Sequence, residues 1–451
     1  MSAQAIQVEH RAPMNFDRGA TALIRSQRLL AEARQELRLA ADIFGDIADD
    51  RRASRRPTAP TGVVDLPVGG LGAGAVRGVA TRLGRRVTKG RPTLDPMFEE
   101  LLRGWDGEHV VVRFDRPSGT WMLVGVHSSA LGPAMGGTRM KAYRSVDEAL
   151  HDVLRLSQAM TMKQAAAGLA FGGGKAVLAV PSVPPPGSAA RRDLLHRYGD
   201  LVESMGGSYV TAADMNTGET DLDIVGERTD HVLGRSPAHG GSGSSAGGTA
   251  LGVFHGILAS VRHAFGGADL EGRCVLVQGV GAVGAHLAEL LRDAGARLVL
   301  ADLVDQRAAD VAASLGAVSV PAHHVFDTEC DVFSPCAAGG VLSAETIPLL
   351  RCRVVAGAAN NQLATAWDGD RLHDRGILYA PDYVINAGGV IHLAGYERLG
   401  WDEAQMAARL AGIGQTLTDL FGSADRQGIT PAAAADRLAS ERLAAAVAAR
   451  A

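Results

Sequence analysis

The chain has 451 residues, of which 46% are hydrophobic and 21% charged, and its formal net charge at pH 7 is −4. This length predicts two or three domains with large cores. The charge balance argues against a chain built as a whole to bind nucleic acid. No apolar run reaches the roughly 18 residues that would span a bilayer, and the first residues do not resemble a secretory signal.

Cysteine usage indicates the compartment. Cys274, Cys330, Cys336 and Cys352 follow no CxxC spacing. We therefore expect reduced thiols in a cytoplasmic protein that has no metal site. Three histidines also lack metal-ligand spacing and are expected in the core or on the surface: His323, His324 and His392.

Residues 1–96 form an extension whose composition differs from the rest. Leucines recur among polar residues up to about Asp50, a pattern that predicts a helix. From Arg51 to Arg91, ten basic residues face a single acid, Asp65, among prolines and glycines, which is typical of a disordered linker. Two alternatives remain open: the linker binds an anionic partner, or the natural start of the protein is Met97.

Downstream, the sequence becomes regularly patterned. Val110–Phe114 and Trp121–Val126 are predicted strands. Gly132–Arg139 contains too many glycines for regular structure and is expected to be a loop. Ser145–Glu148 has the spacing of a capping box, which predicts the start of an amphipathic helix that leads to Lys163.

Two lysines, Lys163 and Lys175, lie in a largely apolar segment, with three glycines directly before the second. Glycines allow a sharp turn or the close approach of a ligand. Burial lowers the pKa of a lysine, and a neutral amine near pH 7 is a usable base. On spacing alone, an equally good explanation is that both lysines are solvated, Lys163 at a helix end and Lys175 after a loop. A buried strand, Ala176–Val180, follows.

The next elements lead to a single acid. Arg191–Met205 is a predicted helix, and the strand that begins at Tyr209 ends at Asp214. Taken alone, Asp214 is better explained as an ordinary helix N-cap or a surface acid than as a functional residue. Gly240–Thr249 has the composition of a linker, and Ala250–Phe265 is the helix that follows.

A glycine-rich fingerprint comes after this linker. The buried strand Arg273–Gln278 runs into Gly279-Val280-Gly281-Ala282-Val283-Gly284 and a helix. The next strand ends in Asp302, 18 residues after Gly284. This context predicts a Rossmann domain, in which the glycines admit a pyrophosphate to the helix N-terminus. Asp302 would bond ribose hydroxyls and repel a 2′-phosphate, which favours NAD over NADP.

The remaining chain adds short strands and long helices. Strands are predicted at Asp331–Ser334, Val354–Gly357 and Leu378–Ala380. From Ala404 onward the chain is alanine-rich and helical, with a break near Gly428. The whole pattern is that of an α/β protein.

From about Met97 to its end, the sequence resembles the glutamate/leucine/phenylalanine/valine dehydrogenase family, and most of all its phenylalanine, leucine and valine branch. The resemblance implies a substrate domain at 97–240, a Rossmann NAD-binding domain at 241–385 and C-terminal helices at 386–451 that return to the catalytic domain. The stretches that carry it, in family order, are Leu131–Arg139, Met160–Lys163, Gly172–Lys175, Thr211–Asp214, Gly279–Gly284, Cys336–Gly340, Val355–Asn361 and Tyr379–Gly389.

The resemblance implies reversible oxidative deamination of an L-amino acid to a 2-oxo acid and ammonia, with NAD accepting the hydride. Lys175 would be the general base that activates water against the imine, and Asp214 would move protons at the amine. Lys163 would bind the substrate carboxylate, and Asn360 and Gly136 would contact the substrate. The residues that would line the cofactor are Arg139, Asp214, Ser245, Thr249, Gly279, Val280, Gly281, Ala282, Val283, Gly284, Asp302, Ala337, Ala338, Ala358, Ala359 and Asn360.

The same resemblance places Met135, Ala212, Val390 and Leu393 around the substrate side chain. Glutamate enzymes of the family carry a lysine at the position of Met135, where it pairs with the side-chain carboxylate. An apolar residue there would leave a buried carboxylate unpaired, so we expect an apolar substrate such as leucine, valine or phenylalanine. Ala212 and Val390 resemble the leucine enzymes, whereas Leu393 resembles the phenylalanine enzymes.

The family also implies a homo-oligomer, and we expect neither a membrane nor a nucleic acid as partner. An alternative of another class is a catalytically idle, NAD-binding scaffold or sensor that uses its basic N-terminal arm to bind a partner. The presence of both lysines and of Asp214 argues against this alternative.

Overall fold

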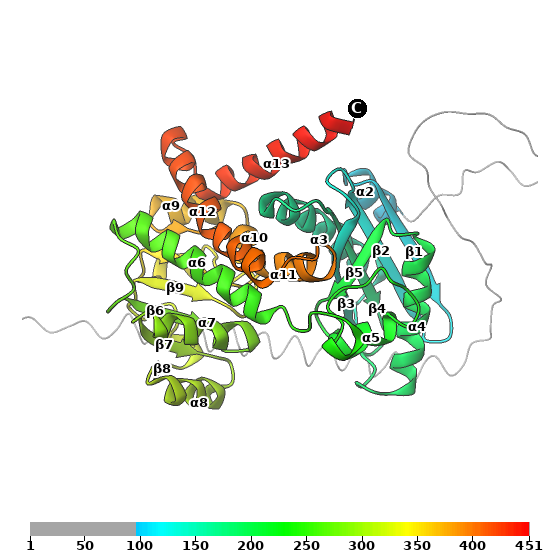
Figure 1. Cartoon of the computed structure of the whole chain (residues 1–451), viewed down its shortest axis with the longest axis horizontal. Coiled ribbons are helices and arrows are strands. Elements are labelled where there is room, and N and C mark those ends of the chain that lie inside the picture. Colours follow the sequence, from blue (N-terminus) through cyan, green and yellow to red (C-terminus); the bar gives the residue numbers. More distant parts are fainter. Residues whose placement is uncertain (1–95, 451) are drawn as a thin grey trace, which may run out of the picture. The chain divides into compact units, whose positions relative to one another are not determined.

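The computed structural model describes residues 96–450 (Figure 1). The helix and the basic linker that we predict within residues 1–95 lie outside the described residues. All described residues belong to one of the two units of the chain, Val64–Ala451. None of the described helices is long and apolar enough to cross a membrane.

The first sheet is mixed and follows the short helix α2 (Pro96–Arg103). Its strands are β1 (His109–Asp115), β2 (Thr120–Ser128), β3 (Ala134–Lys141), β4 (Gly172–Ala179) and β5 (Tyr209–Ala213). They lie in the order β1-β2-β4-β3-β5. β3 pairs in parallel with β4 and β5, whereas β2 pairs antiparallel with β1 and β4. β4 is therefore the middle strand of the sheet.

The loop predicted at Gly132–Arg139 is wrong, because most of this stretch is β3. Its glycines permit the close approach of neighbouring backbones. A Cβ on Gly136 would lie 1.8 Å from the carbonyl oxygen of Gly174 in β4, and one on Gly137 would lie 2.4 Å from that of Ala213 in β5. Pairing on both edges offsets the low strand propensity of glycine, a tertiary effect that the local composition does not show.

Helices cover both faces of this sheet. The long helix α3 (Val146–Ala167) packs Leu150 and Val153 against Val177 of β4. On the other face, α4 (Ala189–Ser204) and α5 (Glu219–Val225) pack against the alternate strand residues, such as Leu178. Of the predicted capping box, the N-cap is confirmed, because the Ser145 hydroxyl accepts a hydrogen bond from the backbone N–H of Glu148 at 3.1 Å. The reciprocal bond differs, because the Glu148 carboxylate accepts the backbone N–H of Arg144 at 3.0 Å and not that of Ser145.

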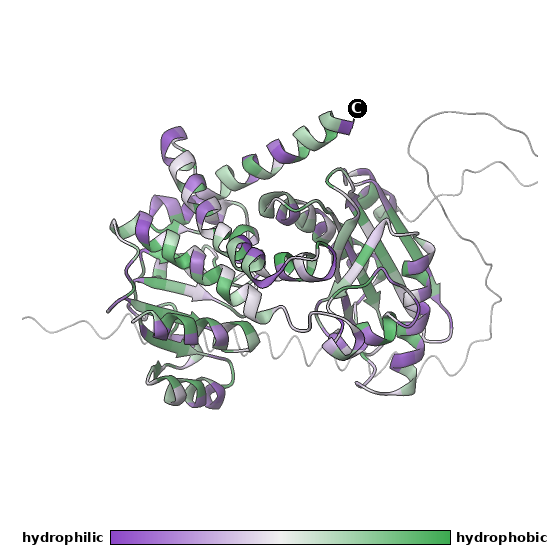
Figure 2. Cartoon of the chain, in the orientation of Figure 1, coloured by the Kyte–Doolittle hydropathy of each residue, from purple (hydrophilic) through white to green (hydrophobic). Residues whose placement is uncertain are grey.

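The second sheet is parallel and has the strand order β11-β10-β9-β6-β7-β8. Its strands are β6 (Cys274–Gln278), β7 (Arg297–Ala301), β8 (Val318–Ser319), β9 (Val332–Pro335), β10 (Val354–Val355) and β11 (Leu378–Tyr379). The first strand, β6, lies between β7 and β9. The order of the strands therefore reverses beside β6, and this is the Rossmann arrangement predicted from the glycine fingerprint. In Figure 2 the strands of both sheets are mainly hydrophobic. Helices such as α8 (Asp305–Leu315) instead carry both hydrophobic and hydrophilic residues.

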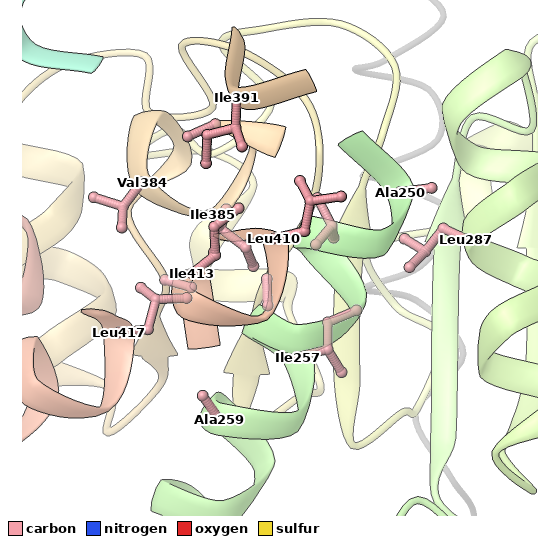
Figure 3. Packing of buried hydrophobic residues seen from close by; sticks show 14 of the residues in the cluster. Ala250, Ile257, Ala259, Leu287, Val384, Ile385, Ile391, Leu410, Ile413 and Leu417 are labelled. Carbon is pink, nitrogen blue, oxygen red and sulfur yellow. The ribbon is translucent and has the colours of Figure 1, made fainter. Parts of the chain in front are cut away.

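The largest core cluster joins this sheet to the helices around it. Two glycines of α6 (Ala246–Phe265) let this helix lie close to α10 (Asp382–Ile385) and α12 (Glu403–Gln427). A Cβ on Gly252 would lie 2.6 Å from Ile413 of α12, and one on Gly256 would lie 2.4 Å from Ile385 of α10 and 3.0 Å from Leu417 of α12. Figure 3 shows these three side chains beside α6. The helices are α6 (Ala246–Phe265), α7 (Ala282–Asp293), α9 (Trp367–Asp374), α10 (Asp382–Ile385), α11 (Gly388–Glu397), α12 (Glu403–Gln427) and α13 (Pro431–Arg450), and short 3₁₀ turns span Pro237–His239, Ala322–His324 and Ile347–Leu349.

Most predicted boundaries agree with these elements within a few residues. Two differ by more. The helix predicted from Ala250 begins at Ala246, so the linker is shorter than its composition indicates. The strand predicted from Ala176 begins at Gly172, so the three glycines and Lys175 are part of β4. The predicted break in the C-terminal helices is confirmed, since α12 ends before Gly428, which adopts a left-handed φ of 63°.

Candidate active site

Lys175 lies in the middle of the first sheet, and its side chain is only 9% exposed. Of the two possibilities that the glycines before it left open, the sharp turn is not formed, because they are strand residues. They serve close packing instead. A Cβ on Gly173 would lie 2.1 Å from the backbone nitrogen of Thr161 in α3, and one on Gly174 would lie 2.7 Å from the ring of Tyr209. The glycines therefore let α3, which carries Lys163, lie directly on β4.

The carboxylate of Asp214 is the partner of Lys175. Asp214 follows β5, and its Oδ2 lies 2.5 Å from Lys175 Nζ and 3.5 Å from Arg139 Nε. Burial raises the pKa of Asp214, but the two cations outweigh burial and hold its pKa below the ordinary value. Asp214 is not a helix N-cap, because α5 begins after Gly218. Its backbone N–H donates to Thr217 Oγ1 at 2.9 Å, which holds the turn after β5.

Lys163 lies near the end of α3 and donates from Nζ to Asn360 Oδ1 at 2.8 Å. Asn360 follows β10 of the second sheet. This hydrogen bond therefore joins α3, which packs on the first sheet, to a loop of the second sheet. Burial lowers the pKa of Lys163 to about 8, with the nearby charge of Lys175 acting in the same direction and that of Asp382 opposing it. Lys163 is therefore a cation that loses its proton in the mildly alkaline range.

The four predicted side-chain pocket residues belong to one hydrophobic cluster. Met135 and Ala212 are 2% and 6% exposed, and Val390 and Leu393 of α11 pack against the same cluster. In the register of the sheet, Met135 pairs with Gly173 and Gly137 pairs with Ala212. Because strand residues alternate between faces, Met135 and Ala212 lie on the face that carries Lys175. This apolar surface therefore lies beside the two lysines.

The predicted glycine fingerprint lies at the carboxyl end of β6. Gly279 has a φ of 94°, and a Cβ on Gly284 would lie 1.9 Å from the carbonyl oxygen of Gly279, so the turn and the helix pack as the fingerprint requires. Gly281 is the N-cap of α7 and has no side chain to cap the helix. A Cβ built at this position would meet nothing within 4 Å. Open space therefore adjoins the α7 N-terminus, which fits a bound pyrophosphate.

Asp302 follows β7 and reaches back to this loop. Its Oδ2 accepts the backbone N–H of Val280 at 3.0 Å, and its Oδ1 accepts that of Val304 at 3.0 Å and lies 3.3 Å from Arg307 Nη1. The carboxylate is therefore fixed beside the fingerprint. The neighbouring Leu303 is 89% exposed, an apolar side chain next to the place where a nucleoside would lie.

The other predicted cofactor residues also follow the carboxyl ends of strands. Ala337 and Ala338 come after β9, and Ala358 and Ala359 come after β10. A Cβ on Gly279 would lie 2.7 Å from the Cβ of Ala337, so the two loops touch. Two predicted residues lie elsewhere: Ser245 is the N-cap of α6, and Thr249 Oγ1 donates to the carbonyl of Ser245 at 2.9 Å. A Cβ on Gly389 would lie 2.8 Å from Thr249 Oγ1.

Known proteins share both the sequence and this fold. The model of the "Glu/Leu/Phe/Val dehydrogenase, dimerisation domain" matches residues 118–231, and that of the "Glutamate/Leucine/Phenylalanine/Valine dehydrogenase" matches residues 301–451. The leucine dehydrogenase of Geobacillus stearothermophilus is 41% identical over 76% of this chain and 92% of its own. The valine dehydrogenase of Streptomyces virginiae is 45% identical over 74% of this chain and 93% of its own. The chain belongs to the Glu/Leu/Phe/Val dehydrogenase family.

Solved structures agree with this assignment. The L-tryptophan dehydrogenase from Nostoc punctiforme is 36% identical, with a TM-score of 0.66 over 77% of this chain and 99% of that chain. A hetero-hexameric glutamate dehydrogenase from Thermus thermophilus, 24% identical, shares the fold with a TM-score of 0.63 over 81% of this chain and 99% of that one. The protein is thus an amino-acid dehydrogenase, an oxidoreductase.

Three side chains of this family member bond the predicted site residues or the loop that holds them, but they were given no role in the site from the sequence. Asn386 is buried, and its Nδ2 donates to Asn360 Oδ1 at 2.9 Å. Asp382 accepts the backbone N–H of Gln362 at 3.1 Å, which holds the loop that contains Asn360. Burial raises the pKa of Asp382. Asp382 and Asn386 lie in the Tyr379–Gly389 stretch that resembles the family, so this stretch held a signal that our assignment of roles did not use.

The third such residue is Asp152, in the middle of α3, which contacts Arg139 at 2.8 Å. It lies outside every stretch quoted for the resemblance, and on a helical wheel it is one acid among several. His392 is half-buried with its ring edge-on to Tyr396, and burial lowers its pKa. His323 and His324 form a 3₁₀ turn. Among the described residues, no group of three or more His, Cys, Asp or Glu could hold a metal ion.

Proposed function

We propose that the protein catalyses the NAD-dependent, reversible oxidative deamination of an apolar L-amino acid to its 2-oxo acid and ammonia. The observation that carries this proposal is the arrangement of two lysines on one face of a sheet. Lys175 Nζ lies 2.5 Å from Asp214 Oδ2. Lys163 donates to Asn360, and it is Asn360 that belongs to the Rossmann side. One cation is thus paired with a carboxylate, and the other bonds a neutral amide.

Lys163 fits the role of carboxylate binder. Within residues 96–450, its ammonium group bonds a neutral amide and no carboxylate, so a substrate carboxylate can supply a negative charge. Its pKa of about 8 means that it is mostly charged at neutral pH. Asn360, and Gly136 in the neighbouring strand β3, would contact the same substrate.

Lys175 and Asp214 fit the roles of base and proton carrier. Lys175 would remove a proton from the water that attacks the imine, and Asp214 would take up and return protons at the amine nitrogen. Their 2.5 Å contact allows a proton to pass between them without a large movement. The burial of Lys175 keeps bulk water away from this exchange.

NAD supplies the hydride acceptor. Gly279–Gly284 would hold the pyrophosphate at the N-terminus of α7, and Asp302 would bind the ribose. Ala337, Ala338, Ala358 and Ala359 would line the rest of the cofactor, with Ser245 and Thr249 at the start of α6. Because Asp302 is 8% exposed and carries a negative charge beside the fingerprint, it disfavours the 2′-phosphate of NADP. Arg139 was predicted to line the cofactor as well; its guanidinium lies between two carboxylates of the substrate domain.

An apolar substrate is supported by the apolar side chains of Met135, Ala212, Val390 and Leu393, which belong to or pack against one hydrophobic cluster. A glutamate side chain placed there would lose its hydration without gaining a cation. Relatives named leucine dehydrogenase and valine dehydrogenase support a branched aliphatic substrate. The tryptophan dehydrogenase shows that a large aromatic side chain is compatible with a related fold.

The assembly and the compartment complete the proposal. A homo-oligomer is supported by the name of the matched dimerisation domain. Four free thiols, Cys274, Cys330, Cys336 and Cys352, fit a reducing compartment such as the cytoplasm. Two observations support the division into a substrate domain (97–240), a Rossmann domain (241–385) and returning helices (386–451). The first is that the chain forms two separate sheets. The second is that Arg442 of α13 donates to the carbonyls of Ala165 and Ala166 at the end of α3.

The test is a substrate panel. The protein is mixed with NAD and L-leucine, L-valine, L-phenylalanine or L-glutamate, and NADH is followed by its absorbance. We expect turnover with at least one apolar amino acid and little with glutamate. The same panel with NADP tests the cofactor. Absence of turnover with every apolar amino acid, in a protein that still binds NAD, would support the idle scaffold or sensor instead.

A further inference from the structure

Asp152 lies on α3 at the centre of a charged network. Its side chain is 14% exposed. Arg139 Nη1 and the hydroxyl of Tyr143 both donate to its Oδ2, at 2.8 and 2.7 Å, and Arg155 Nη2 donates to its Oδ1 at 3.0 Å. Burial raises the pKa of Asp152, but the bonds from Tyr143 and the two arginines outweigh burial and hold the pKa below its usual range. The residue is therefore a fixed anion.

Arg139 links this anion to the proposed catalytic pair. Its Nη1 is held by Asp152, while its Nε lies 3.5 Å from Asp214 Oδ2, the same oxygen that Lys175 approaches at 2.5 Å. This Nε is buried and has no hydrogen-bond partner in the described part of the chain. Burial lowers the pKa of Arg139, but Asp214 and Asp152 more than compensate, so the guanidinium stays charged. The row Asp152–Arg139–Asp214–Lys175 thus alternates in charge.

We propose that Asp152 is a positioning residue of the reaction: it holds Arg139 against Asp214 and balances the charge of Arg139, so that the Lys175–Asp214 pair exchanges protons at the working pH. This inference rests on the proposed function of that pair. It assigns Arg139 to the proton-transfer pair and not to the cofactor. It also explains why a buried guanidinium leaves one N–H without a hydrogen-bond partner, since that group faces the carboxylate at longer range.

The sign of the effect follows from the charges around the pair. Arg139 approaches it from β3, Lys163 from α3, and Asp382 of α10 acts on Lys163. Asp152, Tyr143 and Arg155 act through Arg139. Removing the anion Asp152 leaves the cation Arg139 uncompensated, which makes loss of a proton from the pair easier. Removing Arg139 makes loss of that proton harder.

The test measures kcat for oxidative deamination of the best amino acid from the panel, between about pH 6 and pH 11, in the full-length protein. For Asp152→Asn we expect the acid limb of the profile to move to lower pH, and for Arg139→Gln to higher pH, each by on the order of one unit. Arg139→Lys keeps the charge and should leave the limb nearer to that of the unaltered protein. Glu148→Gln is the matched control, because Glu148 is a carboxylate one turn earlier on α3 that pairs with the exposed Arg144. The acid limb of this variant should not move.

Opposite shifts cannot arise from a role in stability alone, which would lower the amount of active enzyme without moving the limb. Shifts of the same sign for Asp152→Asn and Arg139→Gln, or no shift in either, would overturn the inference while leaving the deaminase activity established. Should Asp152→Asn not fold by circular dichroism, Asp152→Ser is measured in its place, with the same expected sign. If the unaltered protein turns over no amino acid, the proposed function itself fails, and the inference fails with it.

Discussion

Lys163 Nζ and Asn360 Oδ1 are 2.8 Å apart, although 197 positions separate the two residues in the chain. The same amide oxygen accepts a bond from Asn386 Nδ2 at 2.9 Å. Two donors on Oδ1 fix the orientation of the Asn360 amide, so its own NH₂ group points away from both. The arrangement keeps the ammonium group of Lys163 close to a neutral partner and leaves its charge for the substrate.

Changing Asn360 to aspartate should therefore weaken substrate binding. A carboxylate at this position would neutralise Lys163 internally and compete with the carboxylate of the amino acid. We expect KM for the amino acid to rise by roughly one to two orders of magnitude, as charge-assisted bonds are worth about 1.5–3 kcal/mol. The matched control is Asn361→Asp, which adds the same charge one residue further on, at an exposed side chain. A KM that is equal in both variants would contradict the proposed role of the Lys163–Asn360 contact.

Substrate binding should also depend on pH through Lys163. Burial lowers the pKa of this group to about 8 in the unliganded protein. Below that pH the ammonium form predominates and attracts a carboxylate; above it the charge is lost. The affinity of the cofactor-loaded protein for a non-reactive carboxylate analogue of the amino acid should fall by up to about tenfold per pH unit above 8. Calorimetric titration at several pH values measures this decline. Lys163→Arg should abolish it, because arginine remains charged throughout.

The two lysines should differ in which kinetic constant they control. Lys175→Ala removes the proposed base and should lower kcat by roughly 10²–10⁴-fold. Lys163→Ala should act mainly on KM, because it removes a group that binds the substrate. Steady-state kinetics with both variants separate these effects, and NADH binding by fluorescence checks that the Rossmann domain is intact. Full kcat in Lys175→Ala would refute the assignment of the base.

The close packing of α3 on β4 can be tested through Gly173. A Cβ at this position would lie 2.1 Å from the backbone of Thr161, which cannot move aside as a flexible side chain could. Gly173→Ala should lower the free energy of unfolding by about 1–3 kcal/mol and shift α3, and Lys163 with it. In contrast, a Cβ on Gly412 in α12 would meet nothing within 4 Å, so Gly412→Ala should raise the free energy of unfolding by about 0.5–1 kcal/mol. Urea unfolding measures both. Equal effects would show that α3 is not held by this contact.

Cofactor preference should depend on Asp302. Asp302→Ala removes the negative charge that disfavours a 2′-phosphate, and Arg307, which lies 3.3 Å from Asp302, would be released to bind that phosphate. We expect kcat/KM to fall with NAD and to rise with NADP. Asp305→Asn is the control, because it removes an exposed carboxylate three residues later. An unchanged ratio in Asp302→Ala would place the ribose elsewhere.

Local patterns in the sequence determined much of this protein. The strand–glycine–helix fingerprint and Asp302 at the end of the following strand predicted the Rossmann domain, because each depends on residues that are neighbours in the chain. The motifs around Lys163, Lys175 and Asp214 likewise predicted the family. These features are encoded locally by periodicity, capping and glycine spacing, and they needed no knowledge of distant contacts.

Only the tertiary structure decided what the glycines and the charges do. Gly132–Arg139 is a strand and not a loop because it pairs with β4 on one edge and β5 on the other. Gly172–Gly174 do not turn the chain but let a helix lie on a strand. The partners of the lysines, Asn360 and Asp214, and the support given by Asn386 and Asp152 join residues from separate elements. Such pairings depend on how the sheets and helices pack together, which no local pattern records.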